Sequence, residues 1–196
     1  MNIDIDELIR KCREHDPLAW EALVKTFQGR VYAMCYYYLK NSHEAEEVAQ
    51  DTFVLVYRKF EQYVGKGSGL APWILAIARN ACIDRTRYNG ARLPNYQGPD
   101  EDSSDPPIVD EELGPEGQQM MNQSQALIYQ ALAHTSAQTR ELILLRDIQG
   151  LKLQEIAHIT GLPLGTIKSR CNRAKVELAR IINKIDPSYA RPGTLN

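Results

Sequence analysis

The sequence has few of the residues that bind metals and none of the motifs that carry catalysis. Its 196 residues include four cysteines and four histidines, without a Cys-x-x-Cys pair or a histidine at metal-ligand spacing. We therefore expect reduced, packed thiols, no metal site and no cofactor. The absence of a glycine-rich phosphate loop and of a nucleophile motif leaves an enzyme with little support.

Long apolar runs are missing as well. No stretch approaches the roughly 20 apolar residues that a membrane-crossing helix requires, and residues 1–16 mix charges without the apolar centre of a signal peptide. We expect a cytoplasmic protein without membrane insertion. Period-two strand patterns are also absent and helical periodicity dominates, which predicts an all-α fold.

Charge is divided unevenly along the chain. The net charge of −2 by itself argues against a nucleic-acid binder. Residues 1–90, however, hold 12 Lys/Arg and 12 Asp/Glu, residues 91–117 hold one Arg against eight acids, and residues 118–196 hold ten basic and five acidic residues. The basic last part, net +5, is the part that the charge pattern indicates for nucleic-acid binding.

Two helices are predicted in residues 17–60. The first begins at Asp16-Pro17, because Asp is a favoured N-cap and proline at the first helical position lacks only an N–H that would have no partner there. Apolar residues at three- and four-residue steps carry this helix to about residue 39. A break at Asn41-Ser42 then starts a second helix that reaches about residue 60.

The rest of the chain predicts two small helical domains joined by an acidic flexible linker. A loop with three glycines, 63–69, precedes a helix that Pro72 is expected to open, which completes a first domain of residues 1–90. Residues 91–117 are rich in Pro, Gly, Asp and Glu and bury too little apolar surface to fold, so they form the linker. Helices resume in a second domain, 118–186, before a loose tail, 187–196.

The second domain carries a helix-turn-helix pattern. A short helix, 153–160, is followed by a tight turn, 161–163, and a longer helix, 164–184. Apolar residues of the longer helix repeat at steps of four and three and predict its buried stripe: Ile167, Cys171, Ala174, Leu178 and Ile181. The polar residues left outside suit DNA, because Arg and Lys bind guanine edges or phosphate and Asn pairs with adenine.

Two alternatives remain open at this point. The first is that the charges of the basic helix are only solvated and bind nothing. The second is that the motif belongs to any of the many classes of transcriptional regulator that carry a helix-turn-helix. The turn and the absence of acids between Leu164 and Lys175 favour DNA binding over the solvated surface. They do not identify the class of protein.

Both halves of the chain resemble one family. The stretch RELILLRDIQGLKLQEIAHITGLPLGTIKSRCNRAK resembles the fourth conserved region of sigma factors, and HEAEEVAQDTFVLVYRKF followed by PWILAIARNACIDRTR resembles their second region. Two such domains joined by a short linker are typical of the extracytoplasmic-function (ECF) subgroup of the sigma-70 family. This resemblance implies a polymerase specificity subunit that reads a −35 duplex and holds the melted −10 strand.

The resemblance also implies roles for individual residues. Residues expected at the −35 duplex are Thr166, Lys168, Ser169, Arg170, Asn172, Arg173 and Lys175. Residues expected at the melted −10 strand, where the loop 61–71 and the helix after it would capture a flipped base, are Lys66, Ser68, Leu70, Trp73, Arg79, Asn80, Asp84, Arg85 and Arg87. Residues expected to bind core polymerase are Glu47, Gln50, Asp51 and Phe53.

Partners follow from the same resemblance. They are core RNA polymerase, through its β′ clamp coiled coil and its β flap, promoter DNA, and an anti-sigma factor. Relatives usually carry an aromatic residue where Leu70 stands, and Asn172 replaces an aromatic or His, so we expect this chain to have its own promoter preference. The competing classes are a two-domain helix-turn-helix regulator outside the polymerase and an enzyme with a DNA-binding tail.

Overall fold

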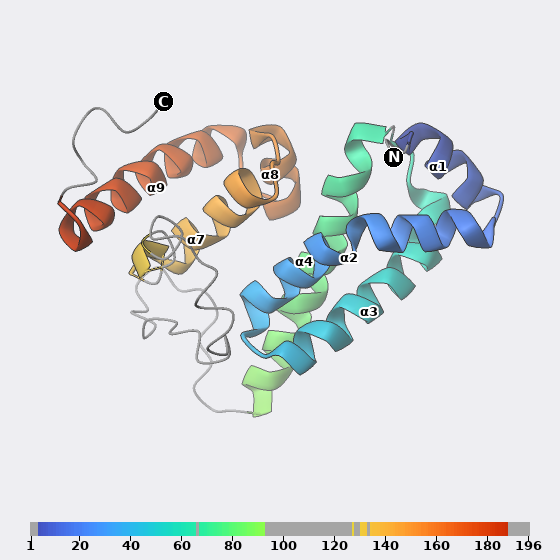
Figure 1. Ribbon diagram of the computed structural model, residues 1–196, viewed down its shortest axis with the longest axis horizontal. Helices are drawn as coiled ribbons and strands as arrows, with labels where there is room; N and C mark the ends of the chain where they lie inside the picture. Colours follow the sequence, from blue (N-terminus) through green and yellow to red (C-terminus); the bar gives the residue numbers. More distant parts are fainter. Residues whose placement is uncertain (1–3, 66, 93–126, 128–129, 133, 188–196) are drawn as a thin grey trace. The chain divides into compact units, whose positions relative to one another are not determined.

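The computed structural model describes residues 4–65, 67–92, 127, 130–132 and 134–187. All regular structure in these residues is helical, which confirms the predicted fold class (Figure 1). The elements, in chain order, are α1 (Ile5–Arg13), α2 (Pro17–Leu39), α3 (Ser42–Lys59), η1 (Phe60–Gln62), α4 (Gly67–Arg92), α7 (Ala137–Ile143), η2 (Leu144–Ile148), α8 (Leu153–Thr160) and α9 (Leu164–Ile185).

The described residues form two compact units. The first holds those up to residue 92 together with 154–161, and the second holds those from 127 to 153 and from 162 to 187. The predicted linker lies outside the described residues except for its first two, which end α4. The tail beyond residue 187 also lies outside them. The domain boundaries therefore stay a prediction.

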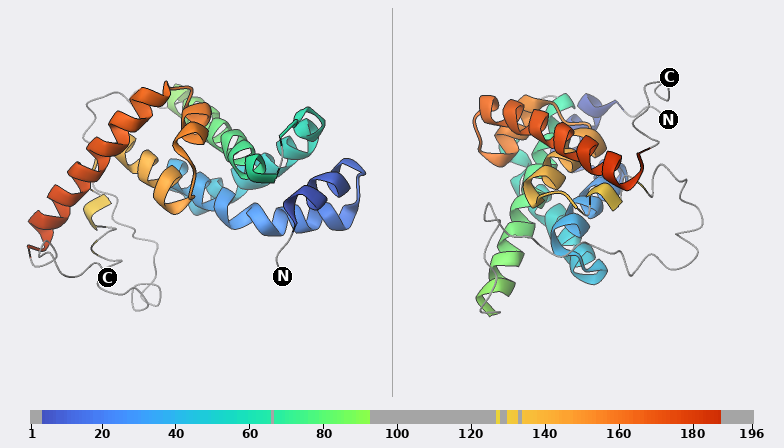
Figure 2. Two further views of the ribbon diagram at one scale, coloured as in Figure 1. Left: turned by 90° about the horizontal axis from the view of Figure 1, so that it is seen from above. Right: turned by 90° about the vertical axis from the view of Figure 1, so that its left-hand side faces the viewer.

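The first unit is built from α1 to α4. Helix α2 contacts both α3 and α4, α3 contacts α4, and α1 lies against α2 and α4; these helices can be followed in Figure 2. The apolar residues between them are completely or almost completely buried, including Leu23, Val31, Val56, Ile74 and Ala78. Helix α3 is therefore enclosed by two neighbours, and only its outward side is available for a partner.

Helix α1 was not predicted from the sequence. The side chain of Asp4 caps it by accepting from the N–H groups of Asp6 and Glu7, and Leu8, Ile9 and Cys12 are buried. The pattern is short, and charged residues fill every position between the apolar ones. A helix of nine residues is marginal alone, so packing on α2 and α4 decides that it forms.

The predicted helix starts at residues 16 and 41 are confirmed. Asp16 caps α2 by accepting from the N–H of Leu18, at 2.8 Å, and proline occupies the first helical position. Asn41 caps α3 by accepting from the N–H of Glu44, at 3.0 Å. Both caps are local in sequence, which is why the sequence alone predicts them.

The predicted start of α4 is wrong. The helix begins at Gly67, and Pro72 lies inside it, so the last three residues of the expected glycine loop, 67–69, belong to the first turn of a helix. Asp6 makes this start favourable, because its Oδ1 accepts a hydrogen bond from the N–H of Gly67 at 2.8 Å. Pro72 removes one hydrogen bond near the helix start, and the distant cap offsets part of that cost.

The second unit is centred on α7 and α9. These helices contact each other, and Leu145, Ile167, Cys171 and Ala174 are buried. Glu177 of α9 accepts from the backbone N–H of Ser136 at 3.0 Å and from the hydroxyl of Thr139 at 2.6 Å. These hydrogen bonds connect α9 to the start of α7. The π-helical segment η2 directly follows α7.

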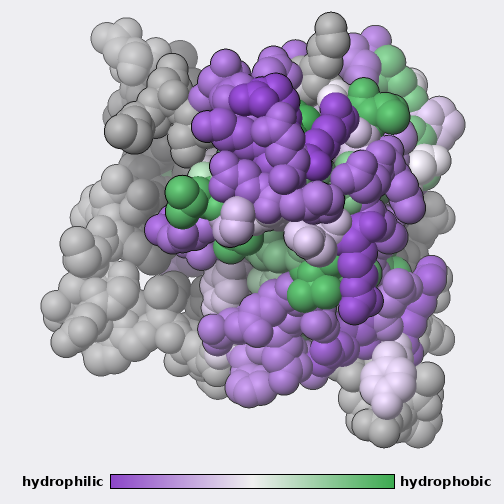
Figure 3. Space-filling model, turned by 90° about the vertical axis from the view of Figure 1, so that its right-hand side faces the viewer, coloured by the Kyte–Doolittle hydropathy of each residue, from purple (hydrophilic) through white to green (hydrophobic). Residues whose placement is uncertain are grey.

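The surface is mainly polar where it can be seen. The side that carries α1 is hydrophilic over most of its area, with hydrophobic side chains in small separate patches (Figure 3). Among the described helices, none combines the length and apolar character needed to cross a bilayer.

Candidate nucleic-acid interface

Helix α9 separates an apolar side from a polar one. Ile167, Cys171 and Ala174, the first three members of the predicted stripe, are buried. Leu178 and Ile181 are only half-buried, because the stripe runs past the neighbours that cover its first half. The outer side of the first half is therefore fixed toward solvent.

The residues predicted for the −35 duplex share this outer side. Five of them are exposed and two, Thr166 and Arg170, are half-buried. Arg173 Nη2 donates to Ser169 Oγ at 3.1 Å, one helical turn away. The first turn of α9 carries no acid and Lys168 follows it directly, so this cation and the positive end of the helix dipole both favour an anion. This side can bind an anion such as a phosphate backbone. The five exposed residues are Lys168, Ser169, Asn172, Arg173 and Lys175.

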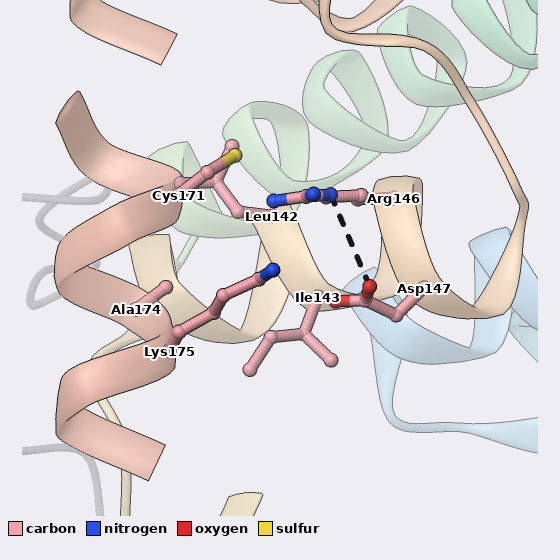
Figure 4. A pocket seen from close by; sticks show the side chains of 7 residues that line it. All are labelled: Leu142, Ile143, Arg146, Asp147, Cys171, Ala174 and Lys175. Atoms are coloured by element: carbon pink, nitrogen blue, oxygen red, sulfur yellow. Dashed lines mark ion pairs between the residues drawn. The ribbon is translucent and has the colours of Figure 1, made fainter. Parts of the chain in front are cut away.

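The sequence did not single out Arg146. Figure 4 shows the side chains of Arg146, from η2, and Lys175, from α9, extending into the space between these elements. Arg146 Nε lies 4.0 Å from Asp147 Oδ1. A surface of α9 with one more cation beside it suits phosphate better than α9 alone. The π-helical turn departs from the α-helical period of 3.6 residues, so the sequence did not predict where this arginine lies.

Helix α4 carries most of the residues predicted for the −10 strand. Asn80, Asp84 and Arg87 are exposed, and Arg79 and Arg85 are half-buried. Arg87 Nη1 lies 3.9 Å from Asp84 Oδ1. The next residue, Tyr88, is 58% exposed and adds an aromatic ring that the sequence analysis did not select. Polar edges, cations and a ring on one helix are the groups that a single strand needs.

Other predicted −10 residues are placed differently. Leu70 has no exposed surface, so it supports the core and cannot touch DNA directly. Trp73 is half-buried, with its ring centroid 5.0 Å from that of Tyr63 and 6.1 Å from that of Phe60, which favours a mainly packing role. Lys66 and the side chain of Ser68 lie outside the described residues.

The residues predicted to bind polymerase lie on α3. Glu47, Gln50 and Asp51 are exposed and Phe53 is half-buried. Val54, 48% exposed, lies one turn after Gln50 and Asp51 on the same side of the helix. It was missed because a valine in a helix usually belongs to the core.

The acidic side of α3 meets the cationic side of α4. Arg85 Nη1 donates to Glu47 Oε2 at 3.1 Å, and Arg85 Nη2 lies 4.0 Å from Asp51 Oδ2. The structure thus brings one residue predicted for DNA together with two predicted for polymerase. No sequence pattern linked them, because 34 to 38 positions separate them and only the packing of α3 on α4 sets the register.

Comparison with known proteins adds a family to these features. The Sigma-70 region 2 family matches residues 23–92, and the Sigma-70, region 4 family matches residues 125–178. The first contains α3 and α4. The second contains α7, α8 and the polar side of α9.

Individual relatives align over most of the chain. The ECF RNA polymerase sigma factor RpoE of Cereibacter sphaeroides is 32% identical over 170 residues, which cover 85% of this chain and 88% of that protein. The ECF RNA polymerase sigma factor SigW of Bacillus subtilis is 28% identical over 186 residues, which cover 92% of this chain and 97% of SigW.

Solved structures share the fold. The sigma factor RpoE of Bartonella quintana, in complex with the anti-sigma factor NepR, superposes with a TM-score of 0.61 at 24% identity, covering 85% of this chain and 97% of that one. CnrH, in complex with the cytosolic domain of CnrY, gives 0.63 at 18% identity, covering 93% and 99%. Both conserved regions and full-length relatives agree, and this chain belongs to the ECF RNA polymerase sigma factors of the sigma-70 family.

Proposed function

We propose that this chain binds core RNA polymerase and directs it to promoters by reading a −35 duplex with α9 and holding the melted −10 strand with α4. The observation that carries the proposal is the outer side of α9, where five exposed polar or cationic residues lie opposite a buried apolar stripe. No acid interrupts this side in the first turn. A helix of this kind fits the major groove, which is about 12 Å wide.

Contacts of two kinds follow from the chemistry of this side. Lys168 and Lys175 are point charges and suit phosphate, whose contacts fix position without reading sequence. Asn172 and Arg173 have forked polar ends and suit adenine and guanine edges. Promoter preference at −35 is therefore assigned to the second pair, with Arg146 as a further phosphate contact.

Helix α4 would hold the melted strand. Unstacking a base costs a few kcal/mol, and the cations of α4 with the exposed ring of Tyr88 supply contacts that offset it. Asn80 and Asp84, both exposed, offer polar edges to a flipped base. Leu70 contributes by supporting the start of the helix from the core.

Protein partners would use the remaining surfaces. The exposed acids Glu47 and Asp51, with Val54, form a side of α3 suited to the β′ clamp coiled coil, and the second unit would reach the β flap. A solved relative is bound to an anti-sigma factor, and we include such a partner for this chain. The chain performs no bond chemistry of its own in this scheme, because its action is binding alone.

Reconstitution with core polymerase and a random promoter library tests the function. Transcripts should start downstream of one shared pair of motifs only when the chain is present. The double variant Lys168→Ala, Arg173→Ala should lose the −35 motif, whereas Arg180→Ala, an exposed arginine further along α9, should keep it. Tight binding to promoter duplex at physiological salt without polymerase, combined with no specific transcription, would instead establish a separate regulator.

A further inference from the structure

Helix α1 is tied to the start of α4 by a hydrogen bond between residues far apart in sequence. Asp6 Oδ1 accepts from the N–H of Gly67 at 2.8 Å, across 61 positions. The fit is close, because a Cβ on Gly67 would lie 3.3 Å from the same oxygen. An amide at a helix start has no partner inside the helix, so this carboxylate supplies an acceptor for the first amide of α4.

A second hydrogen bond joins α1 to Tyr63, at the other end of the short segment, 63–67, that connects η1 to α4. Arg13 Nη2 donates to the carbonyl oxygen of Tyr63 at 2.7 Å, across 50 positions. Asp6 and Arg13 are seven residues apart on α1, which is about 10 Å along the helix axis. Tyr63, which directly follows η1, and Gly67, which begins α4, are therefore both attached to one rigid helix.

The described part of the segment lies against the ring of Tyr63. Tyr63 is 5% exposed and its ring lies 5.0 Å from that of Trp73. Burial is the main cause that raises the pKa of Tyr63, with a smaller contribution from the charge of Asp6. A Cβ on Gly65 would lie 2.5 Å from the Tyr63 hydroxyl, so a side chain at this position would displace the Tyr63 ring.

These two hydrogen bonds affect a segment that lies directly before the proposed −10 site. It joins η1 to α4 and opens the stretch proposed to take up the flipped base of the −10 element. A segment that is ordered before it binds loses less conformational freedom on binding. Helix α1 holds Tyr63 and Gly67 in place from outside the sequence that matches the family, since the region 2 match begins at residue 23.

We propose that Asp6 and Arg13 are positioning residues, through which α1 holds Tyr63 and Gly67, and with them the start of α4, in the positions that receive the melted −10 strand. This proposal rests on the proposed function. It differs from a plain stabilising role because it affects one DNA element. The −35 duplex, which α9 would read, should be unaffected.

The test uses the full chain in complex with core polymerase and two probes, a single-stranded −10 oligonucleotide and a −35 duplex, both from promoters selected with the wild-type chain. Asp6→Ala and Arg13→Gln should weaken oligonucleotide binding by about 3- to 10-fold, the effect of one lost hydrogen bond. Asp6→Asn keeps a side-chain acceptor and should stay within about twofold. The matched control is Glu7→Ala, which removes a carboxylate paired only with Arg10 and Lys11 in the described contacts.

Two further measurements separate positioning from folding. Gly65→Ala displaces the same segment without touching α1, so it should reproduce the −10 defect even if an α1 variant fails to fold. Transcription from a template opened in advance at −10 should remain impaired, because strand capture and not duplex melting is affected. Equal loss of −10 and −35 binding, or full −10 binding in Asp6→Ala, overturns the proposal. If the wild-type chain gives no promoter-specific transcription with core polymerase, the proposed function itself has failed.

Discussion

Arg85 of α4 donates a hydrogen bond from Nη1 to Glu47 Oε2 of α3 at 3.1 Å, and its Nη2 lies 4.0 Å from Asp51 Oδ2. The two acids belong to the side proposed for polymerase, and the arginine to the side proposed for the melted strand. The same guanidinium cannot fully serve both carboxylates and a DNA phosphate. Docking of a cationic polymerase surface on α3 should therefore make Arg85 available to DNA.

Neutralising Glu47 tests this connection. In the isolated chain, Glu47→Gln should raise affinity for a single-stranded −10 oligonucleotide by about 2- to 5-fold, because it removes a partly exposed ion pair worth about 0.2–1 kcal/mol. Fluorescence anisotropy at about 0.1 M salt measures the change. The same substitution in an Arg85→Gln background should have no effect. A gain that persists without Arg85 would mean that Glu47 acts by general repulsion of DNA.

Substitutions on α9 should separate phosphate from base contacts. Lys168→Ala should weaken binding to every −35 sequence about equally. It should also make the negative slope of log affinity against log salt shallower by about 0.9, because one phosphate contact is lost. Asn172→Ala should cost about 1–3 kcal/mol on the preferred sequence, relax preference at one position and leave the slope unchanged. Holoenzyme binding to duplexes with single base changes, measured at several salt concentrations, gives both quantities. Exchanged results for the two variants would reverse their roles.

Sequence reasoning succeeded where the causes are local. The caps at Asp16 and Asn41 lie beside the helices that they start, and spacing alone predicted the three buried residues in the first half of α9, although Leu178 and Ile181 are only half-buried. Helix type and the polar side of α9 were predictable for the same reason. The class of protein came from the family resemblance, in which a region 2 motif precedes a region 4 motif. Helical periodicity alone does not identify such motifs.

Sequence reasoning failed where distant segments decide. The start of α4 depends on Asp6, 61 positions away, and the neighbour of Arg85 is set by how α4 packs on α3. Leu70 was expected at the DNA, but once Gly67 starts a helix the same residue turns into the core. These outcomes depend on tertiary register, which a local pattern does not encode.

Glu177 should be important for the stability of the second unit without contacting DNA. It accepts from the Ser136 N–H at 3.0 Å and the Thr139 hydroxyl at 2.6 Å, so its removal takes away both of these hydrogen bonds between α9 and the start of α7. Glu177→Ala should lower the free energy of unfolding by about 1–3 kcal/mol. Urea unfolding measures it, and Glu177→Gln, which keeps an acceptor, should lose less. If −35 affinity falls while unfolding does not change, Glu177 has a role in DNA recognition.

Cys12 should make the stability of the first unit depend on pH in the alkaline range. Its side chain is buried on α1, and burial, followed by the charge of Asp16, raises the pKa of the thiol to about 11 from 9.0. The folded chain keeps the proton longer than the unfolded chain, so the neutral thiol contributes stability below pH 9 that is lost as the pH rises toward 11. Urea unfolding of wild type and Cys12→Ala at pH 7.5, 9 and 10 isolates this contribution, since lysines and tyrosines titrate in both proteins. The stability difference between the two should shrink with rising pH, and a constant difference would show that Cys12 ionises alike in the folded and unfolded chains.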